Sequence, residues 1–348
     1  MALVGILWCK PPEALPESPA GNPDDEDVIV EVIAVEGSLR RLGHTPDRIY
    51  VEEDIAPVVS WVREHPDGVI FNLCESFRGS NLAHANMPAL LELLGVPYTG
   101  SGPLACGLTT HKSLAKALLA GLGLPTPRGI LVRPGERADA AAQRAELRFP
   151  LMVKPALEDA SVGIDEASVV DDADGLTARV AWVHERYFQD AIVEEYIDGR
   201  EINSAVIGND PPEALPLSEI VFSYPEGKRR VVGYRSKWVH DSFEYRNTKG
   251  VCPAPVDPAV ESRIKELAVA AYRATGCRDY ARVDFRLDPQ GKPWILEVNA
   301  NPDITDGAGL ARAIRGSGRG YDALIRVIIE ATLSRRGATA GTRTLREA

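Results

Sequence analysis

The sequence predicts a protein that combines α/β and α+β parts, with a parallel sheet in its N-terminal domain. Patterns of buried strands and helices alternate up to about residue 106, which is typical of a parallel sheet. Further along, the segment 281–303 has the pattern of a β-hairpin, and an amphipathic helix over 258–276 leads into it. An alternating part followed by strand-rich parts therefore predicts a three-domain chain.

The composition is that of an ordinary globular protein. The chain has 348 residues, of which 45% are hydrophobic and 26% charged, enough for two or three domains. The net charge of -11 argues against nucleic acid or an anionic membrane as a partner, and the longest apolar runs are far too short to span a bilayer. The five cysteines form no CxxC pair, which favours reduced thiols and a cytoplasmic protein.

Residues 1–106 are predicted to form the N-terminal α/β domain. The apolar start "LVGILWC" lacks the basic front and cleavage site of a signal peptide, so we interpret it as a buried strand. The stretch at 11–27 is rich in proline and acidic residues and is expected to be a loop. Helices are expected at 28–43 and 86–95, and strands at 3–9, 67–75 and 96–100.

Residues 107–190 are predicted to form a small α+β domain. It would begin with a helix over 110–123, for which Thr110 is a plausible N-cap. Strands are expected at 128–132 and 149–156 and a helix within 171–187.

Residues 191–335 are predicted to form the larger C-terminal domain. Its first strand, 191–197, would turn at Asp198-Gly199 as a hairpin into the strand 200–208. Two further strands, 216–224 and 231–238, precede a long loop at 240–255. The last helix has a buried stripe, and the tail 336–348 is expected to be disordered. The stripe consists of Leu324, Ile325, Ile328 and Ile329.

The hairpin at 281–303 brings polar side chains together. A two-residue loop, Gln290-Gly291, would place Asp284 opposite Glu297 and Arg282 opposite Asn299. Because side chains alternate along a strand, these four share one face. The other face would be apolar and buried: Val283, Phe285 and Leu287 against Val298, Leu296 and Trp294.

The two carboxylates on this face need a positive charge nearby. Their β-carbons would lie about 5 Å apart, and at an effective dielectric constant of about 20 the repulsion costs roughly 3 kcal/mol. Asp284, Glu297 and the amide oxygen of Asn299 are hard oxygen ligands of the kind that Mg²⁺ or Mn²⁺ prefers. The alternative is a solvated sheet face on which the acids meet by chance.

Three lysines occupy positions suited to phosphate contacts. Lys154 ends a buried strand, Lys112 opens a helix and Lys237 lies in "YRSKW". The loop "EDASVGI" after Lys154 has small residues whose amides could cover phosphates. Taken singly, each lysine has the alternative of being a surface residue, and the loop that of being an ordinary turn.

Five separate motifs resemble one family. They are "VKPALEDASVG", "VEEYIDGREI", "SKW…CPAP", "RVDF" with "EVNANP", and "LLELLGVPYTGSGPLACGLTTHKSLAKALLAGLGLPTP". Together they resemble the ATP-grasp superfamily and, within it, the D-alanine–D-alanine ligase group, over about residues 69 to 330. The chain is similar to a divergent member of that group, which implies a three-domain ATP-grasp architecture.

The resemblance implies a role for each matching residue. It makes Asp284, Glu297 and Asn299 the magnesium ligands, as the hairpin pattern also predicts. It implies that Arg282 lies beside the developing oxyanion and that Glu201 holds the ribose. The residues that it places at adenine are Glu194, Glu195, Tyr196 and Ile197. Those that it places at the ATP phosphates are Lys112, Lys154, Ser161 and, on a mobile covering loop, Lys237.

The implied chemistry joins a small carboxylate to a small amine. ATP would convert the carboxylate to an acyl phosphate, which the amine would attack to give an amide. Arg282 and Lys237 would be the catalytic residues. Neither nucleic acid nor membrane is expected as a partner, and the resemblance suggests a homodimer.

The departures from the family pattern concern the substrates. A serine that would contact the carboxylate of the second D-alanine is Ala308, and Ala160 replaces the first of two serines in the covering loop. Trp238, which replaces a tyrosine, and Asp303, which replaces a glycine, are candidate substrate contacts. Asp303 would contact a cationic group of the acceptor, and the alternative is a helix cap or a solvated loop acid. The His-Gly signature expected near residues 72–80 is absent, and the loop at 11–27 replaces an N-terminal glycine-rich motif.

These departures predict a ligase whose substrate pair differs from D-alanine plus D-alanine. Three alternatives stay open. The chain could be a divergent D-alanine–D-alanine ligase of cell-wall synthesis, a nucleotide-binding protein without catalysis, or a phosphotransferase that stops at the acyl phosphate.

Overall fold

The computed structural model describes residues 1–9, 23–78 and 81–344. Most of the predicted loop at 11–27 lies outside the described residues. Helix α1 (Pro23–Arg41) begins inside that stretch, so the loop prediction is wrong for residues 23–27.

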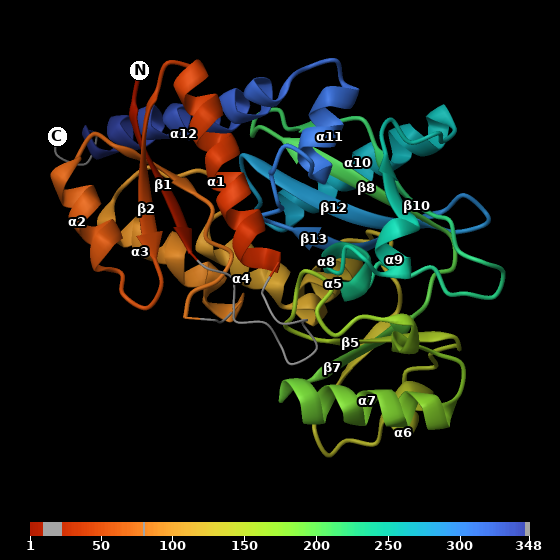
Figure 1. Cartoon of the computed structure of the whole chain (residues 1–348). Helices are drawn as coiled ribbons and strands as arrows, with labels where there is room; N and C mark the ends of the chain where they lie inside the picture. Colours follow the sequence, from red (N-terminus) through yellow and green to blue (C-terminus); the bar gives the residue numbers. More distant parts are fainter. Residues whose placement is uncertain (10–22, 79–80, 345–348) are drawn as a thin grey trace.

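The N-terminal part is built on a three-stranded parallel sheet, which confirms the parallel prediction. The strand order is β2-β1-β3, and the sheet lies beside α1 (Figure 1). Its strands are β1 (Leu3–Cys9), β2 (Thr45–Val51) and β3 (Val69–Asn72), and its helices are α1, α2 (Ala56–Glu64) and α3 (Asn86–Leu94). Neither β2 nor α2 was predicted, and "TPDRIYV" of β2 carries too many polar residues to look like a buried strand. The strand expected at 96–100 is a single bridge between Ile70 and Tyr98.

Two short helices replace the single helix expected at 110–123. They are α4 (Pro103–Thr110) and α5 (Lys112–Gly121), preceded by the 3-10 turn η1 (Asn81–Ala85). Thr110 is the last residue of α4, and its hydroxyl donates a hydrogen bond to the carbonyl of Cys106 (2.9 Å). The N-cap prediction for Thr110 is therefore wrong, because this hydroxyl is used inside the preceding helix.

The central part is a four-stranded antiparallel sheet in the order β4-β7-β5-β6, with α6 and α7 on one side (Figure 1). Its elements are β4 (Gly129–Val132), α6 (Ala138–Arg144), β5 (Leu151–Pro155), β6 (Val169–Val170), α7 (Ala173–Tyr187) and β7 (Ala191–Glu195), with a 3-10 turn η2 (Glu166–Ser168). The predicted boundary at 190 assigned β7 to the C-terminal part, whereas β7 pairs with β4 and β5.

The C-terminal part is a larger antiparallel sheet in the order β11-β10-β8-β12-β13, with β9 beside β8. Helix α10 packs against β8, β12 and β13, and α11 and α12 follow the last strand. The strands are β8 (Arg200–Ile207), β9 (Glu213–Ala214), β10 (Ser218–Phe222), β11 (Thr248–Val251), β12 (Tyr280–Leu287) and β13 (Pro293–Asn299). The helices are α10 (Pro258–Ala274), α11 (Gly309–Gly316) and α12 (Tyr321–Thr344).

The hairpin expected at Asp198-Gly199 is wrong, since β7 and β8 belong to different sheets. Gly199 instead lets the chain cross between the sheets in a tight space. Its φ is +153°, and a β-carbon there would lie 2.1 Å from the carbonyl oxygen of Leu287. Only glycine fits such a close approach to another backbone.

The segment 231–255 also differs from the prediction. Residues 231–238 do not form a strand, because Tyr234–Trp238 is the short helix α8. The expected loop at 240–255 contains α9 (Phe243–Arg246) and β11. The amide of Tyr234 donates to the carbonyl of Ile164 (3.0 Å), so residues 231–238 contact the central part, whereas β11 pairs with β10.

The hairpin of β12 and β13 has the predicted pairing at its polar end, but its turn differs from the prediction. Its loop has three residues, Pro289 to Gly291, with Gly291 left-handed (φ +78°), which is a common three-residue hairpin turn. Leu287 therefore pairs with Pro293 and Phe285 with Ile295. The sequence predicted that Leu296 and Trp294 would be buried on the apolar face. Ile295 is buried there instead, and Leu296 and Trp294 are half-buried.

A β-bulge between Asp284 and Phe285 then restores the register. Beyond it, Asp284 lies opposite Glu297 and Arg282 opposite Asn299, as predicted. The longer loop and the bulge, which the sequence did not predict, shift the register in opposite directions, so the pairing at the polar end of the hairpin is the predicted one.

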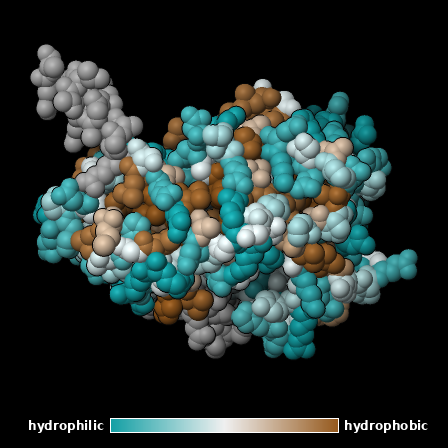
Figure 2. Space-filling model, turned by 90° about the horizontal axis from the view of Figure 1, so that it is seen from above, coloured by the Kyte–Doolittle hydropathy of each residue, from teal (hydrophilic) through white to brown (hydrophobic). Residues whose placement is uncertain are grey.

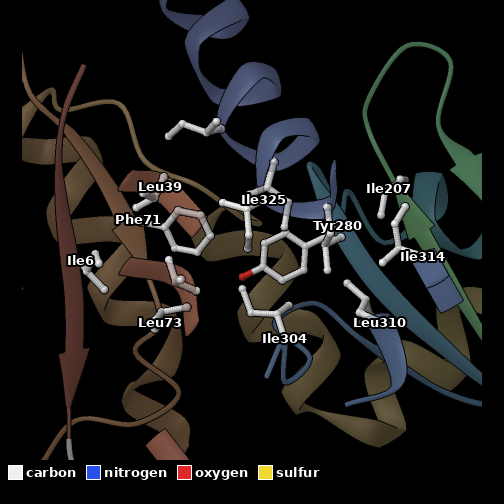
Figure 3. Close-up of a cluster of buried hydrophobic side chains, with 14 of the residues drawn as sticks. Ile6, Leu39, Phe71, Leu73, Ile207, Tyr280, Ile304, Leu310, Ile314 and Ile325 are labelled. Atoms are coloured by element: carbon white, nitrogen blue, oxygen red, sulfur yellow. The ribbon is translucent and has the colours of Figure 1, made fainter. Parts of the chain in front are cut away.

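A hydrophobic cluster joins the N-terminal and C-terminal parts. Figure 3 shows Tyr280 and Ile325 directed toward Phe71 and Leu39 of the N-terminal part. The predicted stripe of α12 is confirmed, since Leu324, Ile325, Ile328 and Ile329 are fully buried. Helix α12 continues to Thr344, so the expected disordered tail does not hold for 336–344, and 345–348 lie outside the described residues.

Among the described residues, no helix is long and apolar enough to cross a bilayer. Hydrophilic residues predominate on the face shown in Figure 2, where hydrophobic ones form separate patches.

Replacing Gly199 with alanine should destabilise the chain by about 2–4 kcal/mol, because the new methyl group meets the Leu287 carbonyl. Denaturant unfolding measures this change. Gly121→Ala is the control, since nothing lies within 4 Å of a β-carbon at that helical position. The control should be neutral or stabilising by up to about 1 kcal/mol. Equal stabilities of the two variants would contradict the close approach.

Candidate active site

The candidate site lies on one face of the C-terminal sheet. The register places Asn203 of β8, Asp284 of β12 and Glu297 of β13 side by side across three strands. Glu201 and Arg286 form the neighbouring row on the same face. Five polar side chains on three adjacent strands thus form a continuous polar surface on a rigid support.

Arg282 supplies the positive charge that the opposed carboxylates require. Its guanidinium makes a bidentate ion pair with Asp284, with Nε–Oδ1 at 2.8 Å and Nη2–Oδ2 at 2.9 Å. The amide of Asn203 also donates to Asp284 (2.6 Å). Burial alone would raise the pKa of Asp284, which is 7% exposed, but Arg282 holds this pKa below its ordinary value.

Glu201 is paired as well. Its carboxylate lies 2.8 Å from the guanidinium of Arg286, which also donates to the carbonyls of Gly199 and Arg230. Burial raises the pKa of Glu201 despite this pair. The contact fixes the position of the carboxylate that the sequence assigned to the ribose, while that role stays a prediction.

A buried cluster from the central sheet faces the same space. Glu194, only 2% exposed, lies between two ammonium groups, Lys154 and Lys116, the latter at 2.7 Å. Burial would raise the pKa of Glu194, but the two lysines lower it to about 2. Burial lowers the pKa of Lys116, whereas for Lys154 the attraction of Glu194 outweighs burial and raises the pKa.

This cluster is tied to the polar face of the other sheet. The ammonium of Lys116 donates to Thr126 (3.0 Å), whose hydroxyl donates to the carbonyl of Ile295 in β13 (2.9 Å). Lys116, Lys154 and Lys237 all lie within electrostatic reach of Glu297. Positive side chains therefore surround the two opposed carboxylates.

Lys112 and Lys237 reach the site from other elements. Lys112 donates to the carbonyl of Glu158 in the loop after β5. Lys237 belongs to α8, and no ion pair or hydrogen bond holds its ammonium among the described residues. Burial and the charge of Arg282 lower the pKa of Lys237. It is thus a cation near the site that an anion could engage.

Helix α8 meets the loop after β5. Ala160 and Ser161 both have left-handed backbones (φ +49° and +65°), a conformation that is strained for residues other than glycine. The indole of Trp238 donates to the carbonyl of Ala160 (2.9 Å). Trp238, predicted as a substrate contact, therefore links α8 to the loop that contains Ser161.

The residues predicted at adenine lie at the end of β7 and directly after it. A surface hollow of about 370 Å³ is lined by the end of β7 and its neighbours: Arg128, Arg148, Phe149, Pro150, Glu195, Tyr196 and Ile197. The amide of Tyr196 already donates to the carbonyl of Pro150 (3.0 Å). Glu194 points away from this group into its ion pairs with Lys154 and Lys116.

Asp303 acts locally in the turn after β13. Its carboxylate accepts from the amide (2.7 Å) and the hydroxyl (3.2 Å) of Thr305. This exposed acid caps no helix, which contradicts the helix-cap alternative and agrees with that of a solvated loop acid, while a contact to an acceptor cation stays a prediction. Ala308 is the N-cap of α11 and offers no side-chain hydrogen bond there.

The metal site stays a prediction. Within residues 1–9, 23–78 and 81–344, no group of three or more His, Cys, Asp or Glu side chains is arranged to hold a metal ion. The predicted set has two carboxylates and one amide, and the amide oxygen of Asn299 accepts from the backbone of Asn301 (3.0 Å).

Three contributors to this site, Lys116, Asn203 and Arg286, were not predicted from the sequence. Lys116 lies one helical turn after Lys112, so their spacing could have placed both lysines on one face of α5. Asn203 and Arg286 could have been found only from the pairing of β8 with β12. These strands are far apart in sequence, and nothing local specifies their register.

Comparison with known proteins identifies the family. Residues 118–330, more than half of the chain, match the family model described as the D-ala D-ala ligase C-terminus. The chain belongs to the D-alanine–D-alanine ligase family. This confirms the predicted ATP-grasp membership.

This ligase-family chain is also similar to individual proteins. It is 38% identical to the uncharacterized protein y4sG of Sinorhizobium fredii over 76% of its own length and 74% of the relative. It is also 38% identical to a D-alanine–D-alanine ligase of Cupriavidus necator over 70% of each chain.

Solved structures share the fold. A D-alanine–D-alanine ligase from Bacillus anthracis, complexed with ATP, has a TM-score of 0.73 at 22% identity and covers 97% of this chain and 100% of its own. The VanG D-Ala:D-Ser ligase from Enterococcus faecalis has a TM-score of 0.74 at 21% identity and covers 95% and 99%. The predicted three-domain ATP-grasp architecture is confirmed at the level of the fold.

Replacing Glu194 with glutamine should cost about 3–5 kcal/mol at pH 7, because it leaves two buried lysines without a counter-charge. The pKa of Glu194 is lowered on folding from 4.5 to about 2, so its contribution is complete above 4.5. The contribution is lost as the pH falls toward 2, and the two proteins should converge there. Denaturant unfolding between pH 7 and 2 measures this.

The matched control is Glu36→Gln. Glu36 also meets two cations, Arg40 and Arg48, but these are largely exposed. Its loss should cost less than about 1 kcal/mol. A cost for Glu194→Gln as small as that for the control would contradict a buried, paired carboxylate.

Proposed function

We propose that the chain is an ATP-dependent, ADP-forming ligase that joins a small carboxylate to a small amine through an acyl phosphate. The observation that carries this proposal is the pairing of Asp284 with Glu297 within electrostatic reach of several cationic side chains. Such an arrangement suits a nucleotide triphosphate bound through a divalent ion. The names of relatives such as the Cupriavidus necator ligase support the same class of reaction.

The residues present fit a magnesium ion. Asp284, Glu297 and Asn299 would hold it, and Mg²⁺ typically uses one or two carboxylates together with phosphate oxygens. No hydrogen bond or ion pair engages Glu297 among the described residues, so its oxygens are available. When bound, the ion would neutralise charge on the transferring phosphoryl group.

The cationic residues would position and stabilise the reacting groups. Lys112 and Lys154 would hold ATP phosphates, and Lys237 would add a third positive charge from α8. Arg282, on the same face as Asp284, would donate to the oxyanion that forms when the amine attacks. The contact between Trp238 and Ala160 would help to hold α8 against the loop after β5 and exclude water from the acyl phosphate.

We further propose a substrate pair other than D-alanine plus D-alanine. Ala308 provides no hydroxyl at the start of α11, and the carboxylate of Asp303 occupies the neighbouring turn. A site without a hydrogen bond for one substrate group discriminates against that substrate. The competing function is that of a divergent D-alanine–D-alanine ligase, which the names of several relatives favour.

ADP release measured over a matrix of amino acid pairs tests the function and the substrate choice. We expect one pair to exceed D-alanine alone by at least about tenfold, with a product mass equal to the two substrates minus water. Asp284→Asn, which removes a predicted metal ligand, is the inactive control.

Three outcomes would overturn parts of the proposal. The fastest turnover with D-alanine alone would establish the competing function. ADP release with one substrate and no amide product would indicate a phosphotransferase. The absence of ADP release with every pair, despite ATP binding, would indicate a nucleotide-binding protein.

A further inference from the structure

Arg179 of α7 is a buried guanidinium that contacts the segment after β5. Only 8% of its surface is exposed, and its Nη2 donates to the carbonyl of Gly163 (2.9 Å) and to the hydroxyl of Ser168 (2.8 Å). The same nitrogen lies 3.0 Å from the carboxylate of Asp165. The guanidinium carbon lies 3.9 Å from the centre of the Trp182 ring, a cation–π contact within α7. One side chain thus ties α7 to three positions between residues 163 and 168.

The loop 156–165, which joins β5 to η2, has a strained backbone directly before this contact. Ala160 and Ser161 are left-handed (φ +49° and +65°), as is Gly163 (φ +71°). Residues other than glycine keep this conformation only where their surroundings hold them in it. The hydrogen bond from Arg179 fixes the carbonyl of Gly163, two residues after Ser161. The arginine is therefore part of what holds the strained segment.

The strained segment carries backbone amides that a ligand could use. Within the described part of the chain, the amides of Ala160, Ser161 and Gly163 donate no hydrogen bond. Unpaired amides beside left-handed residues are typical of anion sites in proteins. The conformation of the loop would therefore decide whether these amides reach a phosphate group.

The loop 156–165 lies at the candidate site. The carboxylate of Asp159 is within electrostatic reach of three residues predicted at the phosphates or the metal ion: Lys112, Lys237 and Glu297. Lys112 also donates to the carbonyl of Glu158. The loop is thus close to the predicted phosphate contacts of both α5 and α8.

Helix α8, which carries Lys237, contacts the same loop twice. The amide of Tyr234 donates to the carbonyl of Ile164 (3.0 Å). The indole of Trp238 donates to the carbonyl of Ala160 (2.9 Å). The arginine behind the loop therefore supports α8 as well.

We infer that Arg179 is a positioning residue that holds the loop 156–165 in the conformation that binds the terminal phosphates of the nucleotide. The inference rests on the proposed function and adds to it a residue that acts through the loop, because its guanidinium is buried and engaged by the loop and by η2. Without this anchor, the loop would relax from its strained conformation. The apparent affinity for ATP would then fall with the fraction of chains that remain competent to bind.

Calorimetry of ATP binding to the full chain, with Mg²⁺ and without amino acids, tests this inference. Arg179→Met keeps an apolar side chain on Trp182 but removes the fork, and should weaken ATP binding at least about tenfold. Asp165→Asn removes the half-exposed partner of Arg179 and should weaken ATP binding about threefold. If Arg179→Met does not fold, the result for Asp165→Asn decides the question.

Two variants of α7 are matched controls. Val183→Ala removes buried methyl groups from the core of the central part, one helical turn after Arg179, and destabilises that part without touching the loop. Arg186→Met removes the same charge from the last turn of α7. Both should bind ATP as the wild type does.

AMP separates a positioning role from a merely structural one. It keeps the base and the ribose but lacks the two terminal phosphates. Its affinity, measured by displacement of ATP, should be the same in the wild type and in Arg179→Met. If amino acid substrates are found, Arg179→Met should raise the KM of ATP at least about tenfold and leave the KM of the carboxylate substrate unchanged.

Three results would overturn the inference. ATP affinity that is equal in the wild type, Arg179→Met and Asp165→Asn would show that the loop does not need its anchor. Equal losses for ATP and AMP, or an equal loss in Val183→Ala, would indicate an arginine that only stabilises the fold. A wild type that does not bind ATP would refute the proposed function as well, whereas ATP binding that ignores Arg179 would refute this inference alone.

Discussion

The structure depends on the placement of two carboxylates opposite each other in a paired hairpin. Asp284 and Glu297 would repel at this distance, and the bidentate contact of Arg282 with Asp284 offsets the repulsion. The bulge between Asp284 and Phe285 is what allows this pairing, because it shifts the register back after a three-residue turn. A shift of β13 by one residue would turn Glu297 toward the hydrophobic core, while the pairing of β12 with β8 keeps Asp284 on the polar face.

The rest of the molecule supplies positive charge to this pair from separate elements. Lys154 comes from β5, Lys116 from α5 and Lys237 from α8, and each lies within electrostatic reach of Glu297. Glu194 holds two of these lysines in place, so their ammonium groups need little reorganisation to meet a phosphate. The central and C-terminal sheets are thus joined by electrostatics as well as by the crossing at Gly199.

The sequence was informative where the signals were local. The stripe of α12, the strand β1 and the helix α10 follow from periodicity, and the polar face of the hairpin follows from alternation. Prediction failed where distant contacts decide the structure. Residues 231–238 have strand-like propensity, yet the contact of Tyr234 with Ile164 favours the helix α8. The ion pair of Lys116 with Glu194 joins residues from different elements, and no local pattern specifies it.

We propose that Asp284 and Glu297 together hold one divalent ion with the nucleotide. Electron paramagnetic resonance of Mn²⁺, titrated in the presence of a non-hydrolysable ATP analogue, tests this directly. The account predicts one tight site that Asp284→Asn and Glu297→Gln each weaken at least about tenfold. Glu219→Gln, which removes a carboxylate paired with Arg200 in the same sheet, should leave that site unchanged. Mn²⁺ binding as tight in both acid variants as in the wild type would contradict the account.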